Sequence, residues 1–229
     1  MKTAIITGAS KGIGLATAKA LQQKGYKVAG WSRSASSLEP SDSYKHFSVD
    51  ITKSEEVSTT YMATLEFLGH VDVLINNAGL GFEGRMEEMP DEEWTKMFDL
   101  NVHGLFYCTK NVVPGMKERK SGHILNISSV AGKTGIPGMA GYCGTKYAVS
   151  GISNALMKEV RKYGIKVTCI YPGAVETNFF DDINSVEAND TMVSPDQIAE
   201  TIAHCVDSPP NLHHVDVDIR PLMNKVTKD

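Results

Sequence analysis

Residues 2–14 read KTAIITGASKGIG, and this stretch combines the three features on which the predicted fold depends. A short β-forming run ends at Thr7, glycines follow at positions 8, 12 and 14, and a helical pattern continues to about residue 24. A strand that leads through a glycine-rich turn into a helix lets backbone N–H groups approach a phosphate at the helix N-terminus. The GxxxGxG spacing differs from the commonest dinucleotide fingerprint, so alone it fits a plain strand–helix turn equally well.

Short, largely apolar strands alternate with helices along the rest of the chain. We expect strands at residues 2–7, 26–31, 47–49, 71–75, 122–127, 165–171 and 215–219. Further helical patterns fall at residues 53–68, 91–116, 142–163 and 195–206. This alternation is typical of a parallel sheet with helices on both faces. We therefore predict a single α/β domain over residues 1–229, a length that can bury a full core.

Two helices carry local signals. Asn101 and Gly104 interrupt the helical pattern of residues 91–116, with Asp91 or Asp99 as candidate caps, so we expect a distortion there. His103 beside them is expected to be a packed or surface histidine rather than a base or metal ligand. At residues 195–206, Ser194 suits the N-cap and a proline follows in the first turn.

The end of the second predicted strand lacks the acidic side chain that would accept hydrogen bonds from the ribose hydroxyls of NAD. Residues 32–34 are Ser-Arg-Ser, and Arg33 offers a planar fork suited to a 2′-phosphate. Lys11 in the glycine-rich turn adds a second positive charge. Both can be read as solvated surface cations, but the missing acid and the two cations together favour NADPH.

A second informative stretch, residues 126–146, reads NISSVAGKTGIPGMAGYCGTK. Its helical part places Tyr142 and Lys146 four residues apart, and therefore on one face of a helix. An ammonium near a phenol favours the phenolate, so we expect Lys146 to lower the pKa of Tyr142. Ser129 can be brought beside the tyrosine by the intervening loop. The alternative for Tyr142 is a core aromatic residue with its hydroxyl satisfied locally.

Composition excludes several classes of function. A net charge of −4 gives no basic footprint for nucleic acid and no polybasic patch for membranes. No apolar stretch reaches the roughly 18 residues of a spanning helix, and the apolar run near the N-terminus is too short for a signal peptide. The four scattered cysteines match neither a zinc spacing nor a redox pair. We expect no metal, reduced thiols and a cytoplasmic location.

Taken together, these motifs resemble the short-chain dehydrogenases/reductases (SDR family) over nearly the whole chain. The run TGASKGIG at 7–14 resembles the cofactor loop of that family, and NNAG at 76–79 resembles its central-strand segment. The run PGAVET at 172–177 resembles the segment that holds the nicotinamide carboxamide. Asn101, Ser129, Tyr142 and Lys146 match the catalytic tetrad in order and spacing. Ser129 rather than Ser128 has the thirteen-residue separation from the tyrosine.

The resemblance implies a Rossmann fold with seven parallel strands in the order 3-2-1-4-5-6-7. It also implies hydride transfer between C4 of NADP(H) and a carbonyl carbon, with Tyr142 as general acid or base and Ser129 as a hydrogen-bond donor. Lys146 would lower the pKa of Tyr142 and bind the nicotinamide ribose, and Asn101 would hold a water that links Lys146 to solvent. The cofactor-binding residues implied are Gly8, Ser10, Lys11, Gly12, Ile13, Gly14, Arg33, Ser34, Asp50, Ile51, Asn77, Ala78, Gly79, Tyr142, Lys146, Pro172, Gly173, Val175 and Thr177.

The sequence therefore predicts an NADPH-dependent carbonyl reductase of small ketones, aldehydes or 3-oxo compounds. The alternatives are a 3-oxoacyl-thioester reductase and a non-catalytic NADPH-binding sensor. Residues 178–193 match the position of a short substrate-covering loop, and residues 133–139 would complete the pocket walls. A stripe of small residues at 144, 148, 151 and 155 indicates either packing on the sheet or, as we favour, a homodimer or homotetramer contact.

Overall fold

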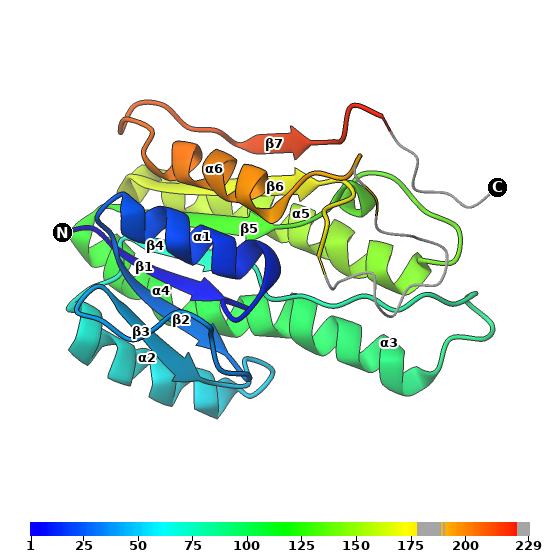
Figure 1. The fold of residues 1–229 in the computed structure, drawn as a ribbon, viewed down its shortest axis with the longest axis horizontal. Helices are drawn as coiled ribbons and strands as arrows, with labels where there is room; N and C mark the ends of the chain where they lie inside the picture. Colours follow the sequence, from blue (N-terminus) through cyan, green and yellow to red (C-terminus); the bar gives the residue numbers. More distant parts are fainter. Residues whose placement is uncertain (178–188, 190, 224–229) are drawn as a thin grey trace.

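The computed structural model of the chain describes residues 1–177, 189 and 191–223. Its centre is one parallel sheet in the order β3-β2-β1-β4-β5-β6-β7, with all strand arrows pointing the same way in Figure 1. The predicted Rossmann topology is confirmed. The strands are β1 (Thr3–Thr7), β2 (Lys27–Ser32), β3 (Tyr44–Ser48), β4 (Val73–Asn76), β5 (Gly122–Ile127), β6 (Ile165–Pro172) and β7 (Asp216–Ile219).

Six α-helices surround the sheet within the described part of the chain. They are α1 (Gly12–Gln23), α2 (Ser54–Leu68), α3 (Asp91–Phe98), α4 (Leu105–Arg119), α5 (Ala140–Val160) and α6 (Pro195–Val206). Short 3₁₀ turns lie at η2 (Val130–Gly132) and η3 (Arg161–Tyr163), and a π-helical segment, η1 (Asp99–Gly104), joins α3 to α4. No helix among the described residues is both long and apolar enough to cross a membrane.

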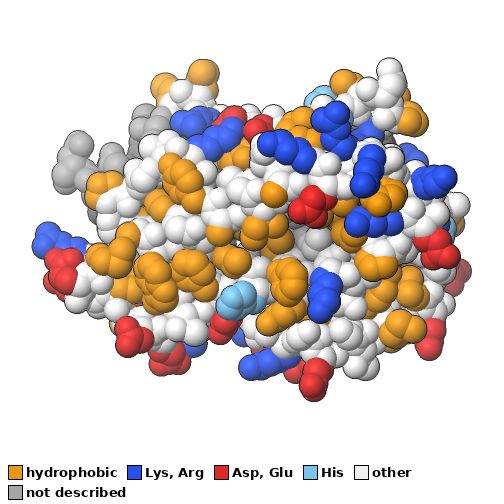
Figure 2. All heavy atoms as spheres, turned by 180° about the vertical axis from the view of Figure 1, so that it is seen from behind, with side chains coloured by type: hydrophobic (Ala, Val, Ile, Leu, Met, Phe, Trp, Pro, Cys, Tyr) orange, Lys and Arg blue, Asp and Glu red, His pale blue; other side chains and the backbone are white. Residues whose placement is uncertain are grey.

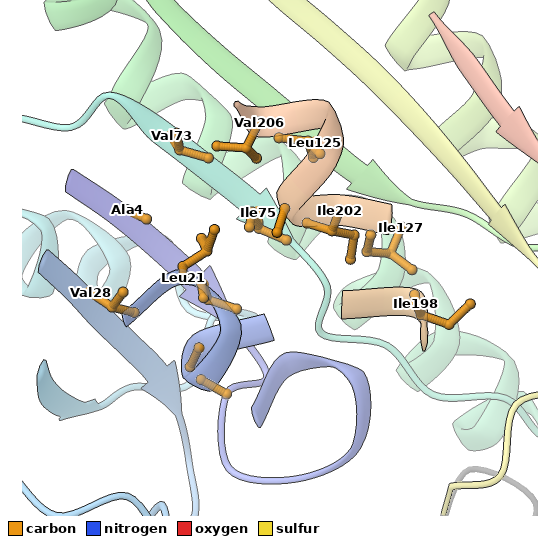
Figure 3. Packing of buried hydrophobic residues seen from close by; sticks show 14 of the residues in the cluster. Ala4, Leu21, Val28, Val73, Ile75, Leu125, Ile127, Ile198, Ile202 and Val206 are labelled. Carbon is orange, nitrogen blue, oxygen red and sulfur yellow. The ribbon is translucent and has the colours of Figure 1, made fainter. Parts of the chain in front are cut away.

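The two faces of the sheet are covered by different helices. On one face, α1 and α6 pack Leu21, Ile198 and Ile202 against strand residues that include Ile75 and Leu125 (Figure 3). On the other face, α2, α4 and α5 enclose a second cluster. The central strand β1 is buried along its whole length, in keeping with the apolar residues between its two terminal threonines.

Strand β3 begins at Tyr44, three residues before the predicted start. Its residues pair one by one with β2, from Tyr44 opposite Val28 to Ser48 opposite Ser32. Tyr44 and Phe47 are buried, whereas the polar residues between and after them are not. Because polar residues follow Tyr44 on this edge strand, a prediction based on apolar runs does not include the first half of the strand.

The expected helix of residues 91–116 is interrupted at the predicted place. A π-helical turn runs from Asp99 to Gly104, and Asn101 within it is buried. Gly104 has no room for a side chain, because a Cβ there would lie 2.9 Å from Ile51 Cδ1. Neither candidate aspartate caps the helix, since α3 begins at Asp91 after Pro90. His103 lies on the surface and pairs with Asp99 at 3.0 Å, as expected for a non-catalytic histidine.

The last helix begins as predicted. Ser194 accepts a hydrogen bond from Gln197 N, and the Gln197 side chain returns one to Ser194 N, which completes a capping box. Strand β7 alternates exposed Asp216 and Asp218 with half-buried residues, as expected for an edge strand. The four cysteines are all buried and free. Most of the expected covering loop at residues 178–193 lies outside the described residues.

Candidate active site

A cavity of about 870 Å³ lies at the carboxyl ends of the parallel strands. Such edges are where ligands bind in open α/β sheets. The cavity is lined by Ser129 and by the predicted cofactor residues except Gly14: Gly8, Ser10, Lys11, Gly12, Ile13, Arg33, Ser34, Asp50, Ile51, Asn77, Ala78, Gly79, Tyr142, Lys146, Pro172, Gly173, Val175 and Thr177. Among the predicted residues, Gly14 and Asn101 do not line it.

The glycine-rich turn can only be built from residues without side chains. Gly8 has φ +68°, and a Cβ there would lie 2.9 Å from Ala78 Cα. A Cβ on Gly14 would overlap the carbonyl oxygen of Gly8. Gly14 therefore serves the close packing of α1 on the loop rather than the cavity wall, and it leaves the N-terminus of α1 facing the cavity.

The asparagine after β4 ties this loop to the neighbouring strand end. Asn77 Nδ2 donates hydrogen bonds to Thr7 O at 2.9 Å and to Gly8 O at 3.3 Å. The Thr7 hydroxyl in turn accepts from the backbone N–H groups of Asn77 and Ala78, both at 3.0 Å. These contacts fix the floor of the cavity between β1 and β4.

Positive side chains gather at one end of the cavity. Lys11 and Arg33 are exposed and line it, together with Ser34. The acidic residue at this end of the cavity is Asp50, which follows β3 and not β2. Burial tends to raise the pKa of Asp50, but hydrogen bonds from Thr52 and the charge of Arg33 outweigh it and hold the pKa below its ordinary value.

Tyr142, Ser129 and Lys146 are brought together at the other end. Tyr142 is 8% exposed, and its phenol interacts with the Ser129 hydroxyl. Ser129 Oγ also donates to Pro172 O at 3.4 Å and accepts from Ala131 N at 3.2 Å. Lys146 Nζ lies 5.6 Å from the centre of the Tyr142 ring.

The two adjacent serines have different partners. Ser128 Oγ donates to the backbone carbonyl of Lys146 at 3.0 Å and lies 3.2 Å from Ser150 Oγ. Its hydroxyl is therefore occupied in attaching β5 to α5. Ser129 is the serine whose hydroxyl interacts with the tyrosine.

The expected lowering of the Tyr142 pKa is not found. Burial raises the pKa of the phenol, and only the hydrogen bond with Ser129 opposes that rise. Lys146 is itself buried, which lowers its pKa to about 8, and its Nζ donates to Ile127 O at 2.8 Å. Loss of hydration around both groups outweighs the attraction between ammonium and phenolate that the sequence argument invoked.

Asn101 acts on the loop behind the site. Its Oδ1 accepts from Leu80 N at 2.9 Å, and its Nδ2 donates to Leu80 O at 2.8 Å and to Thr145 Oγ1 at 3.0 Å. Both amide hydrogens are thus occupied. The side chain holds the turn after Gly79 against the helix that carries Tyr142 and Lys146.

A second, much smaller cavity of about 10 Å³ lies beside Lys146 and Asn101. This is about the space of one water molecule. Asn76 also lines it, and Asn76 Oδ1 is buried without a hydrogen-bond partner among the described residues, although its Nδ2 bonds Thr109 and Asn126. An unpaired buried acceptor beside an ammonium is a suitable place for a bridging water.

Sequence reasoning missed several residues of the cavity wall. Val49, Glu83 and Leu100 line the cavity, and so do Arg220 and Pro221 at the end of β7. Val49 directly precedes Asp50 at a strand end, so the strand pattern could have identified Val49 as a wall residue. Glu83 lies in an irregular segment and had no such signal. Among the described residues there is no group of three or more side chains suited to a metal ion.

The comparisons with known proteins agree with this geometry. A model of the short chain dehydrogenase family matches residues 2–188. An uncharacterized oxidoreductase of Staphylococcus saprophyticus is 37% identical over 235 residues, with 96% of each chain covered.

Two similar solved structures hold nicotinamide cofactors. An alcohol dehydrogenase from the archaeon Thermococcus sibiricus, complexed with 5-hydroxy-NADP, superposes with a TM-score of 0.88 at 29% identity over 98% of each chain. A 3-ketoacyl-(acyl-carrier-protein) reductase from Brucella melitensis, complexed with NADH, has the same TM-score and identity over 96% of this chain and 97% of that one. The chain therefore belongs to the short-chain dehydrogenase family of oxidoreductases.

Proposed function

We propose that the protein is an NADPH-dependent carbonyl reductase that acts on a small ketone, aldehyde or 3-oxo compound. The observation that carries the proposal is that Ser129 and Tyr142, whose hydroxyls interact, line the same cavity as the glycine-rich turn. Two hydroxyls that meet in a water-poor pocket can bind and protonate one oxygen atom of a substrate.

The residues of the cavity fit a dinucleotide. Its volume suits a ligand of that size, and the backbone of Gly8 and Gly12 leaves the N-terminus of α1 open to a diphosphate. Gly79 and Lys146 both line the cavity, so the lysine is accessible from the cofactor side.

The bound nicotinamide supplies a hydride from C4 to the carbonyl carbon. In the same step, Tyr142 donates its phenolic proton to the oxygen that gains negative charge, and the product is the alcohol. Ser129 donates a hydrogen bond to that oxygen. Because burial raises the pKa of Tyr142, the phenol stays protonated at neutral pH, which suits the reductive direction.

Lys146 and Asn101 support this proton transfer. Lys146 binds the nicotinamide ribose and replaces the proton that Tyr142 loses, and a water in the small cavity beside Lys146 returns a proton to the lysine. Asn76 Oδ1 is the acceptor that holds this water. Asn101 positions the surrounding loop through its hydrogen bonds to Leu80 and Thr145.

NADPH is preferred over NADH because the adenosine end of the cavity is lined by Arg33 and Lys11. The two similar structures hold one cofactor of each kind, so the preference rests on this chain's own side chains. Arg33 can bind a 2′-phosphate with two parallel hydrogen bonds.

The protein assembles as a homodimer or homotetramer through α5 and its neighbour α4. Gly144 and Gly151 are exposed, and a Cβ on Gly151 would meet no atom within 4 Å, so the small residues do not pack on the sheet. Tyr147 on α5 and Phe106 on α4 are 47% and 51% exposed. Figure 2 shows hydrophobic side chains gathered on this side of the molecule. A second copy would cover them through a self-complementary contact.

Two rival functions make different predictions for substrate turnover. A 3-oxoacyl-thioester reductase would reduce acyl thioesters with a much higher kcat/KM than free ketones of equal chain length. A non-catalytic sensor would bind NADPH and oxidise none with any member of a panel of diketones, aldehydes and 3-oxo esters.

Replacing Tyr142 by Phe should reduce kcat by at least about 100-fold, because the proton donor is lost. The Kd of NADPH, measured by fluorescence titration, should change little. A variant with wild-type kcat would overturn the assignment of Tyr142 as proton donor.

The buried ammonium of Lys146 gives the stability of the protein a pH dependence. Its pKa is lowered to about 8 in the folded protein, below an unfolded value of about 10.4. The unfolded chain therefore binds more protons between these values, and the free energy of unfolding contributed by Lys146 rises with pH there. Relative to Lys146→Met, the wild type should gain stability between about pH 8 and 10 in urea denaturation. A constant difference across that range would contradict the lowered pKa.

Replacing Arg33 by Gln should weaken NADPH binding by about tenfold or more relative to NADH binding. Calorimetric titration of the two cofactors without substrate measures this ratio directly. Lys53→Gln is the matched control, since Lys53 also lies near Asp50 but does not line the cavity. An unchanged ratio in Arg33→Gln would remove the basis for NADPH preference.

Replacing Gly151 by Phe should shift the protein towards monomer in sedimentation velocity. The phenylalanine side chain would occupy an open position, and phenylalanine has a higher helix propensity than glycine. The protomer itself should therefore stay folded. Lys19→Phe, on α1 at the opposite face, is the control. If Gly151→Phe sediments like the wild type, this face of α5 is not the interface.

A further inference from the structure

Some of the charged side chains that line the cavity have a role in the proposed function, and two have none. Lys11, Arg33 and Asp50 lie at the adenosine end, and Lys146 is buried with its ammonium bonded to Ile127 O. The remaining charged residues of the wall, among those described, are Glu83 and Arg220. Neither has a role in cofactor binding or proton transfer as proposed above.

The end of β7 places the backbone of Arg220 beside the end of β6. Ile219 pairs with Pro172, and Gly173 N donates to Ile219 O at 2.7 Å. A Cβ on Gly173 would lie 3.5 Å from Arg220 Cα. Ser129 Oγ donates to Pro172 O, so the strand end that carries Arg220 lies beside the strand end that Ser129 contacts.

The charge of Arg220 is not compensated within the described part of the chain. No ion pair or side-chain hydrogen bond joins it to another described residue. The nearby cation Lys133 is different, because its Nζ pairs with Asp218 at 2.6 Å and lies 3.8 Å from the centre of the Tyr171 ring. Lys133 also does not line the cavity. Arg220 is thus the cation available to a ligand at this end.

Glu83 limits which anion suits this end of the cavity. It lies on the opposite loop, where Gly84 N donates to Gly138 O at 2.8 Å and a Cβ on Gly138 would lie 3.8 Å from Glu83 Oε1. One arginine and one glutamate favour a monoanion over a phosphate dianion, because each added negative charge is repelled by the carboxylate. A carboxylate also matches the guanidinium fork.

We propose that the substrate carries a carboxylate and that Arg220 binds it, which makes the protein a reductase of short oxo acids and, in reverse, a dehydrogenase of hydroxy acids. This inference rests on the proposed function above and specifies its substrate class. It also separates the protein from a thioester reductase, whose substrates carry no carboxylate near the carbonyl group. Arg220 is a specificity-determining residue that contacts the substrate away from the reacting atoms.

The experiment compares oxo acids with their uncharged methyl esters. Pyruvate, acetoacetate and levulinate place the carboxylate at increasing distance from the ketone, and each is assayed beside its methyl ester with NADPH. At least one acid should have a kcat/KM about tenfold or more above that of its ester, mainly through a lower KM. If every ester matches or exceeds its acid, the inference is wrong, although the carbonyl reductase proposal stands.

Variants of Arg220 test the residue itself. Arg220→Gln should lower the acid-to-ester ratio of kcat/KM about tenfold, and Arg220→Lys should restore part of it because the charge remains. The control is Arg161→Gln, which removes an exposed charge at the far end of α5 and should keep the wild-type ratio. A wild-type ratio in Arg220→Gln, with circular dichroism showing a folded protein, would overturn the role of Arg220. If neither acids nor esters are reduced, the proposed function fails and the inference fails with it.

Discussion

A lysine ammonium inside a protein loses its hydration, and the surroundings of Lys146 are organised around replacing that loss. Its Nζ donates to the carbonyl of Ile127 at the end of β5, and its own carbonyl accepts from Ser128. Gly132 has no room for a side chain, because the Ser128 hydroxyl and the carbonyl of Lys146 occupy that space. These contacts fix α5 against the carboxyl edge of the sheet, and so they also fix Tyr142 one turn away. The positions of the reacting groups therefore depend on keeping one buried charge satisfied.

Much of this arrangement could be predicted from the sequence because it depends on local patterns. Glycine spacing located the turn after β1, the lysine and tyrosine spacing located one helix face, and capping residues located the start of α6. What could not be predicted depends on neighbours that are distant in sequence. The start of β3 at Tyr44 depends on pairing with β2, and the orientation of Asn101 depends on Leu80 and Thr145. The pKa of Tyr142 was predicted in the wrong direction because burial cannot be read from a four-residue spacing.

The cavity has different electrostatic characters at its two ends. Lys11 and Arg33 are exposed to solvent at the adenosine end, where salt screens their attraction for phosphate. Tyr142 and Lys146 are buried at the reacting end, where a low effective dielectric constant strengthens each hydrogen bond and charge. In the proposed function, affinity for the cofactor and control of the proton therefore belong to separate groups of residues.

The π-helical turn between α3 and α4 has a consequence for how this fold can vary. An α-helix turns by about 100° per residue, so removing one residue between Asp99 and Gly104 would rotate all of α4 relative to α3. Asn101 would then leave Leu80, and the buried face of α4 would no longer meet the sheet. Chain length is therefore constrained in this segment, whereas insertions at the exposed residues 39–42, between β2 and β3 and away from the cavity wall, would leave the site intact.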